Sequence, residues 1–86
     1  MKAPILDLYY FDACPYCQRV LKVIDKHHIK VNYIDIYDDL KNLQKLTAIT
    51  GTKMVPCLFI DGDPMHESLD IIAWLEKNLV RLTKTT

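Results

Sequence analysis

The stretch FDACPYC, residues 11–17, brings two cysteines, Cys14 and Cys17, to the point where an apolar run gives way to a helical pattern. The preceding residues 5–11 are mostly aliphatic and aromatic, which predicts a buried strand. Pro15 suits the first turn of a helix, because its missing N–H would have no partner there. The sequence therefore predicts a strand that runs directly into a helix, with both cysteines at the junction.

The two cysteines stand in different predicted environments. Three positions along a helix make about one turn, so the two sulfurs are close enough for a disulfide. Cys14 faces unpaired N–H groups and the positive end of the helix dipole, which favour the thiolate over the thiol. Cys17 lies beside Val20 and Leu21 on the apolar face, where desolvation keeps it protonated until it attacks a mixed disulfide nearby. We therefore expect Cys14 to be the nucleophile and Cys17 the resolving thiol.

A C-x-x-C pair can also be half of a zinc site, which needs two further ligands. The remaining candidate ligands are scattered and form no second pair of standard spacing: Cys57, His27, His28 and His66. A strand-to-helix junction is the setting of redox pairs, whereas metal knuckles usually sit in turns. The sequence therefore favours redox chemistry without a metal. Cys57, inside an apolar run, is expected to be a small buried hydrophobic residue.

Downstream of the pair, the hydrophobic pattern alternates between helical and extended periods. The first helix shows its apolar face at spacings of three and four residues, through Cys17, Val20, Leu21, Ile24 and His28. Residues 31–36 alternate well enough for a second strand. A repeat of leucines, Leu40, Leu43 and Leu46, predicts a second helix, and Gly51 predicts where this helix ends. This half therefore predicts strand, helix, strand, helix.

The second half of the chain predicts a hairpin and a final helix. After Val55-Pro56, residues 57–60 form an apolar run that reads as a strand. Residues 61–64 (DGDP) are a turn signal that leads into a short strand at Met65-His66. Ser68, a good N-cap residue, opens the last helix, whose inner face consists of Ile71, Ile72, Leu75 and Leu79. The complete order is β-α-β-α-β-β-α, an α/β fold with an antiparallel second half.

Length and composition limit the classes of function. The 86 residues, 50% hydrophobic and 26% charged, fit one domain over residues 1–86 with a single modest core. Eleven basic residues balance eleven acidic ones, and without a basic run neither nucleic acid nor membrane is an expected partner. The apolar stretch at residues 5–11 is too short for a secretory signal or a membrane span. We therefore expect a cytoplasmic monomer, in which three cysteines favour redox chemistry over a disulfide framework.

Three motifs together carry a family resemblance: Cys14-Pro15-Tyr16-Cys17 after the first strand, Val55-Pro56 before the third, and Glu67-Ser68 at the start of the last helix. Taken singly, the second motif is also an ordinary turn and Ser68 also a simple N-cap. Together they resemble the glutaredoxins of the thioredoxin fold over nearly the whole chain. The chain is most similar to the N-terminal domain of the bacterial two-domain glutaredoxin that is built like a glutathione S-transferase, through residues 11–17, 51–56 and 67–71.

The resemblance implies a structure for the sheet and for a substrate groove. Strands one and two would be parallel and strands three and four antiparallel, in a four-stranded mixed sheet with helices on both faces. The Val55-Pro56 peptide bond would be cis, and the Val55 backbone would pair with glutathione as a peptide-like substrate. Glu67 and Ser68 would hold the amino and carboxylate groups of the γ-glutamyl residue at a helix N-terminus. Tyr16 would lie along the same groove.

The function that the resemblance implies is glutathione-dependent exchange of thiols and disulfides. Cys14 and Cys17 would be the catalytic residues. Glutathione would be the co-substrate, and no cofactor would be tightly bound. The substrates would be proteins joined to glutathione through a mixed disulfide and proteins with disulfide bonds of their own. Such an enzyme would serve electron transport and cell redox homeostasis.

Three other functions stay open at this point. A thioredoxin-like reductant served by a flavoprotein reductase would use the same cysteine pair without glutathione. An iron–sulfur cluster carrier would share a cluster between two chains through Cys14 and bound glutathione, but Pro15 and Tyr16 are unlike the smaller residues usual in such carriers. A glutathione transferase would need a helical domain for its electrophile, for which 86 residues leave no room.

One position departs from the pattern of many glutaredoxins, which carry a lysine three residues before the nucleophile. Phe11 stands there, followed by Asp12, whose negative charge opposes formation of a thiolate at Cys14. The helix terminus must then supply most of the stabilisation of the thiolate, with Arg19 or Lys53 as helpers. Lys53 is also a candidate partner for the glycine carboxylate of glutathione.

Overall fold

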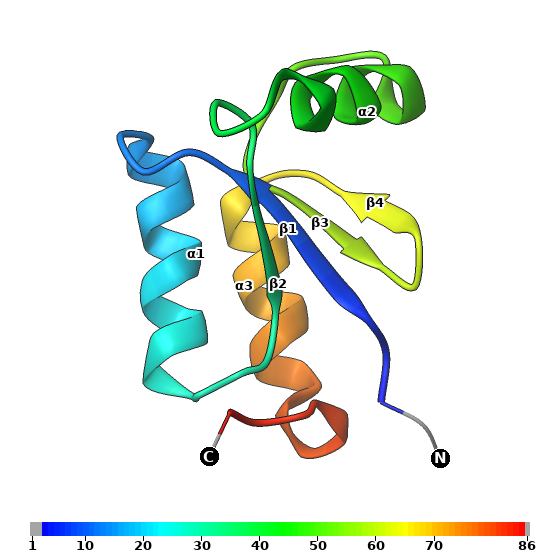
Figure 1. Ribbon diagram of the computed structural model, residues 1–86. Coiled ribbons are helices and arrows are strands. Elements are labelled where there is room, and N and C mark those ends of the chain that lie inside the picture. The colour runs from blue at the N-terminus through cyan, green and yellow to red at the C-terminus, as the bar shows by residue number, and fades with distance from the viewer. Residues whose placement is uncertain (1–2, 86) are drawn as a thin grey trace.

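Four strands form one mixed sheet in the order β2-β1-β3-β4 (Figure 1). The computed structural model describes residues 3–85. Along the chain the elements are β1 (Leu6–Tyr10), α1 (Pro15–Lys26), β2 (Asn32–Asp35), α2 (Leu40–Thr50), β3 (Cys57–Ile60), β4 (Asp63–Met65), α3 (Ser68–Lys77) and a 3₁₀ turn at Leu79–Arg81. This order is the β-α-β-α-β-β-α arrangement predicted from the sequence.

The pairing of the strands places β1 and β3 at the centre of the sheet. β1 is parallel to β2 and antiparallel to β3, with Leu8 opposite both Tyr33 and Leu58. β3 is antiparallel to β4. The parallel first pair and the antiparallel second pair confirm the sheet that the resemblance implies.

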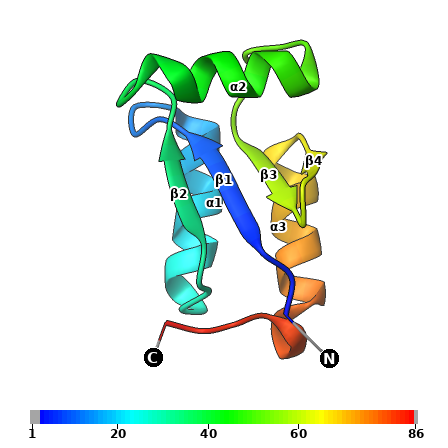
Figure 2. The same cartoon turned by 45° about the vertical axis from the view of Figure 1, so that its right-hand side comes forward.

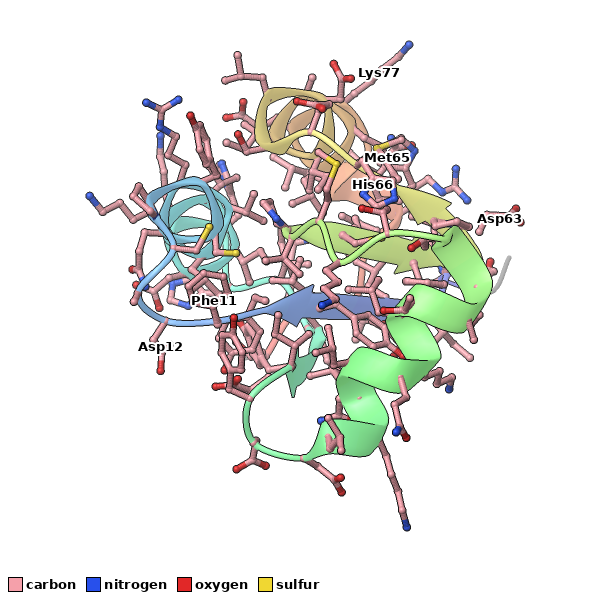
Figure 3. All side chains as sticks on the ribbon, turned by 90° about the horizontal axis from the view of Figure 1, so that it is seen from above. Phe11, Asp12, Asp63, Met65, His66 and Lys77 are labelled. Atoms are coloured by element: carbon pink, nitrogen blue, oxygen red, sulfur yellow. The ribbon has the colours of Figure 1, made fainter. Side chains whose placement is uncertain are left out.

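The helices cover both faces of the sheet. In the view from above, α1 and α3 lie together on one side of the sheet, and α2 lies on the other (Figure 3). Figure 2 shows α2 running across the end of the sheet where β1 ends and α1 begins. No helix within residues 3–85 is long and apolar enough to cross a membrane.

Alternate residues of the central strands supply two cores, one on each face. Leu8 and Leu58 are fully buried under α1 and α3, in a cluster with Val20, Ile24, Ile71 and Leu75. Tyr9, Cys57 and Phe59 point the other way and pack with Leu46 of α2. The rings of Tyr9 and Phe59 lie 5.0 Å apart. This alternation is what the two-residue period of a strand requires when both faces of the sheet are covered.

The hairpin between β3 and β4 is tighter than the sequence predicted. The turn holds only Asp61 and Gly62, both with positive φ (50° and 90°), as two-residue hairpin turns require. β4 therefore begins at Asp63, and the predicted strand at Met65-His66 is wrong by two residues. Pro64 fits in β4 because this strand is at the edge of the sheet, where a missing N–H costs no ladder bond.

Helix boundaries also correct two details. α1 ends at Lys26, and His28 follows it with a φ of 54°, so the prediction that His28 continues the apolar face is wrong. Gly51 ends α2 in the left-handed conformation, with a φ of 77°, and its N–H donates to the Thr47 carbonyl, as predicted. Leu40, however, is 66% exposed, since the first turn of α2 extends beyond the sheet.

Candidate active site

Cys14 occupies the N-cap position of α1, at the end of a short loop from β1. Its N–H donates to the Phe11 carbonyl (3.2 Å), and its carbonyl accepts from the Gln18 N–H (3.0 Å). The Gln18 side chain also donates to the Asp12 carbonyl, at 2.6 Å. These hydrogen bonds connect the loop to the first turn of the helix and place Cys14 at its N-terminus, where the first N–H groups have no partner within the helix.

Cys17 lies one turn further along α1 and is completely buried. Burial raises the pKa of the Cys17 thiol well above its ordinary value, and a hydrogen bond to Cys14 raises it further, although a backbone hydrogen bond from Phe11 partly opposes the shift. Both cysteines are free thiols. The structure thus places Cys14, which is 7% exposed, within hydrogen-bond reach of a second thiol that stays protonated.

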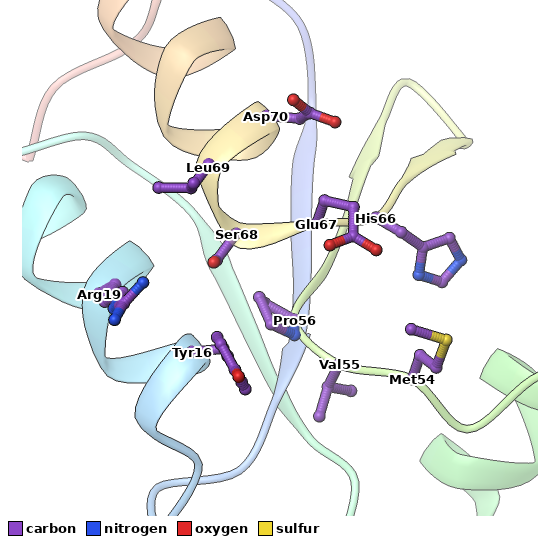
Figure 4. A pocket seen from close by; sticks show the side chains of 10 residues that line it. All are labelled: Tyr16, Arg19, Met54, Val55, Pro56, His66, Glu67, Ser68, Leu69 and Asp70. Carbon is purple, nitrogen blue, oxygen red and sulfur yellow. The ribbon is translucent and has the colours of Figure 1, made fainter.

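A groove of about 520 Å³ opens at the same end of the sheet, and Figure 4 shows the side chains around it. Three segments line this groove: the first turns of α1, the loop before β3, and the start of α3. All five residues predicted to bind glutathione are among the lining residues, which are Tyr16, Arg19, Met54, Val55, Pro56, His66, Glu67, Ser68, Leu69 and Asp70. Their role in binding stays a prediction.

The segment before β3 contributes Met54, Val55 and Pro56 to the lining of the groove. The Val55-Pro56 peptide bond is cis, as the resemblance implied. Pro56 is buried and Val55 half-buried, and both lie across the groove from Arg19 (Figure 4). Lys53, predicted as a helper, is exposed and is not among the residues that line the groove.

The start of α3 corrects one prediction. Glu67, not Ser68, occupies the N-cap position, and its side chain makes no capping hydrogen bond. Glu67 has a φ of 71° and a ψ of 116°, a combination that residues with a side chain rarely adopt and that recurs at functional sites. Ser68 is the first residue of the helix and is 7% exposed. The N-terminus of α3 therefore opens toward the groove without a side-chain cap, which suits an anionic group.

The structure adds five lining residues that the sequence did not assign to the groove: Arg19, Met54, His66, Leu69 and Asp70. Arg19 had a sequence signal, since it is a cation two residues after the cysteine pair, but its position relative to α3 depends on how the helices pack. The side chains of Met54 and Leu69 are more than half exposed. Among residues 3–85, no group of three or more His, Cys, Asp or Glu side chains is arranged to hold a metal ion.

Cys57 follows the cis proline but lies on the other face of the sheet from α1. It is fully buried among Tyr9, Leu46 and Phe59, which confirms the prediction of a buried residue. Its sulfur lies 3.9 Å from Nε2 of His66. Burial raises the pKa of the Cys57 thiol to about 11, although a backbone hydrogen bond from Met65 partly opposes the shift. Cys57 is therefore a protonated thiol that packs in the core on this face of the sheet.

The different environments of Cys14 and Cys57 predict how fast each thiol reacts with an alkylating reagent. At neutral pH the folded protein is expected to react with iodoacetamide at Cys14, while Cys57 reacts at least about a hundredfold more slowly, since it is buried and protonated. Peptide mapping by mass spectrometry measures both rates. Protein unfolded in denaturant is the control, in which all three cysteines should react. Equal rates at Cys14 and Cys57 in the folded protein would contradict this assignment.

The fold and the cysteine pair define the class of the protein: it is a thioredoxin-fold domain of the glutaredoxin type. A family model described as "Glutathione S-transferase, N-terminal domain" matches residues 8–80. The chain belongs to this family.

Relatives of known sequence and structure agree with this assignment. Glutaredoxin 2 of Escherichia coli strain K12 is 32% identical over 73 residues, which are 84% of this chain and 33% of that protein. The chain thus spans about a third of the length of the curated relatives it matches. The glutathione transferase Omega 3C from Trametes versicolor superimposes with a TM-score of 0.77 at 28% identity, over 91% of this chain and 35% of that one. A wheat glutaredoxin shares the fold, with a TM-score of 0.69 at 20% identity, over 92% of this chain and 82% of that one.

Proposed function

We propose that this protein is a glutathione-dependent thiol–disulfide oxidoreductase, with Cys14 as the nucleophile and Cys17 as the resolving thiol. The observation that carries the proposal is the contrast between the two thiols. Cys14 occupies the N-cap position of α1, whereas Cys17 is fully buried and burial raises the pKa of its thiol. Such a pair combines a nucleophile at a helix N-terminus with a second thiol that stays protonated until a mixed disulfide forms beside it.

The reaction with a glutathionylated protein needs Cys14 alone. The Cys14 thiolate attacks the sulfur of the glutathione moiety, the mixed disulfide bond breaks, and the protein substrate leaves as a thiolate that takes a proton from water. Cys14 is then joined to glutathione. The thiolate of a second glutathione attacks the glutathione sulfur of this adduct, which releases glutathione disulfide and restores the Cys14 thiolate.

Reduction of a disulfide within a protein would engage Cys17 as well. Cys14 attacks one sulfur of the substrate, and the other sulfur leaves as a thiolate that takes a proton from water. Cys17 then attacks the Cys14 sulfur and passes its proton to the departing substrate thiolate. The substrate leaves as a dithiol, and Cys14 and Cys17 are joined by a disulfide. Two molecules of glutathione reduce this bond and become glutathione disulfide.

The groove supplies groups of the right kind for glutathione. The uncapped N-terminus of α3 and the Ser68 hydroxyl suit the carboxylate of the γ-glutamyl residue, and Glu67 suits its amino group. Tyr16 and the Val55 backbone would lie along the peptide part. In this proposal glutathione is a co-substrate, no cofactor is tightly bound, and the domain works as a cytoplasmic monomer on glutathionylated or disulfide-bonded proteins.

The test is turnover of a small glutathione mixed disulfide, coupled to NADPH oxidation through glutathione reductase. We expect a rate that is first order in enzyme and that requires glutathione. A protein inactive in this assay but active with NADPH and thioredoxin reductase would instead be a thioredoxin-like reductant. A brown protein whose iron and sulfide depend on Cys14 would instead be a cluster carrier.

A further inference from the structure

Arg19 is a positively charged side chain in a groove whose other charged lining residues are acidic. Among the ten lining residues, all within the described part of the chain, it is the only lysine or arginine. Two carboxylates, those of Glu67 and Asp70, line the same groove from the start of α3. A ligand in the groove therefore meets positive charge from α1 and negative charge from the α3 side.

The guanidinium of Arg19 lies near the ring of Tyr16 and has no carboxylate partner among residues 3–85. Its Cζ lies 5.7 Å from the centre of the Tyr16 ring, one turn earlier in α1, a cation–π contact that limits where the side chain can go. Within residues 3–85, no carboxylate lies within ion-pair distance of Arg19, and the side chain makes no hydrogen bond. Its five N–H donors are thus free for a ligand, in a planar arrangement that fits a carboxylate.

The order of charges along the groove selects one end of glutathione. Figure 4 shows Arg19 on the α1 side, Ser68 facing it from the start of α3, and Glu67 beyond Ser68 toward His66. The γ-glutamyl residue carries a carboxylate and an ammonium group on one carbon atom. Its carboxylate therefore fits between Arg19 and Ser68, with its ammonium group toward Glu67. The glycine end has a carboxylate only and leaves the acidic side chain without a partner.

We propose that Arg19 binds the α-carboxylate of the γ-glutamyl residue of glutathione and makes the groove selective for substrates that carry this charge. This proposal rests on the proposed function. It adds to Glu67, Ser68 and Tyr16 a charged binding residue, so that α1 supplies both the N-cap Cys14 and a contact with the substrate carboxylate. Arg19 touches the substrate but no reacting atom, and so its effect is on binding and orientation.

The test is a single-turnover reaction on a Cys17→Ser background, in which Cys14 is the only thiol of the pair. The substrate is the mixed disulfide of glutathione and thionitrobenzoate. The Cys14 thiolate attacks the glutathione sulfur, the S–S bond breaks, and thionitrobenzoate leaves as a coloured thiolate whose appearance measures the rate. Mass spectrometry identifies the adduct of Cys14 and glutathione. A second substrate has the α-carboxylate of the γ-glutamyl residue converted to an amide, and a third has the glycine carboxylate converted instead.

Arg19→Gln is expected to lower the second-order rate constant with the glutathione substrate roughly five- to tenfold, as loss of one charge-assisted hydrogen bond at an exposed site predicts. With the amide substrate the same substitution should change the rate constant less than about twofold, because the interaction is already missing. Arg19→Lys should recover part of the loss. Lys22→Gln removes the same charge from an exposed position of α1 that does not line the groove, and it should leave both rate constants unchanged.

Each other outcome overturns a different statement. An equal loss with both substrates, or a loss seen also with Lys22→Gln, would show a general electrostatic effect and overturn the role of Arg19. A loss that disappears only when the glycine carboxylate is amidated would place Arg19 at the other end of the tripeptide. If the Cys17→Ser protein, in which Arg19 is unchanged, forms no adduct at all with the glutathione substrate, the proposed function itself is wrong. The proposal for Arg19 is then wrong as well.

Discussion

Replacement of Cys14 by serine is expected to abolish the proposed activity. The turnover of a glutathione mixed disulfide should fall at least about a hundredfold, to the rate of the uncatalysed exchange, since the variant lacks the attacking thiolate. Serine fits the N-cap position of α1 well, so the fold should be kept. Coupled oxidation of NADPH through glutathione reductase measures the rate, and circular dichroism checks the fold.

Cys17→Ser is the matched control, because it makes the same replacement of sulfur by oxygen one helical turn away. With a mixed disulfide of glutathione it should keep most of the rate, while its reduction of a protein disulfide should stop at the mixed disulfide with Cys14. Full activity of Cys14→Ser, or an equal loss in both variants with the glutathione substrate, would contradict the assignment of the nucleophile.

The largest effect on stability is expected for Leu58→Ala. Leu58 is fully buried in β3, between β1 and β4, and packs in the core under α1 and α3. Removing three buried carbon atoms from such a site leaves a cavity and costs about 3 kcal/mol of unfolding free energy. Since small domains are stable by only about 5–15 kcal/mol, this loss should be visible as a lower midpoint of unfolding in urea.

Leu40→Ala provides the comparison for the same chemical change at a site that is 66% exposed. This variant should change the unfolding free energy by less than about 0.5 kcal/mol, the usual range for surface substitutions. If Leu58→Ala and Leu40→Ala lower the unfolding free energy equally, the core between the sheet and the α1–α3 pair would not be the main source of stability.

Much of the fold was predictable because its signals are local. The apolar run before Cys14, Pro15 in the first turn of α1, and Gly51 after α2 each specify a conformation through their own side chains. The start of β4 was not predictable in the same way. The sequence DGDP reads as a four-residue turn, whereas two residues suffice once β3 and β4 pair, and Pro64 is accepted only because its strand is at an edge.

The features of the candidate site were likewise predictable where their signals are local and not predictable where they depend on packing. The positions of the two cysteines, Cys14 at the N-cap and Cys17 on the buried face, could be predicted from sequence because the residues around them specify where α1 begins and which face it buries. Ser68 was placed at the N-cap on its residue type alone, but the chain enters α3 through Glu67 at a positive φ, which no propensity of glutamate predicts. Arg19 could not be assigned to the groove, because its place opposite the start of α3 depends on the packing of two helices distant in sequence.

The groove is assembled from three separate segments of the chain: the first turns of α1, the Met54–Pro56 loop and residues 66–70. They meet only when the sheet and its helices are in place, so a ligand that fills the groove binds the folded chain and not the unfolded one. Occupancy and folding are then thermodynamically linked. A ligand at a hundred times its dissociation constant adds about 2.7 kcal/mol to the unfolding free energy, which is comparable to what a single buried leucine contributes. The concentration of its substrate is thus one of the terms that determine how much of this small domain is folded.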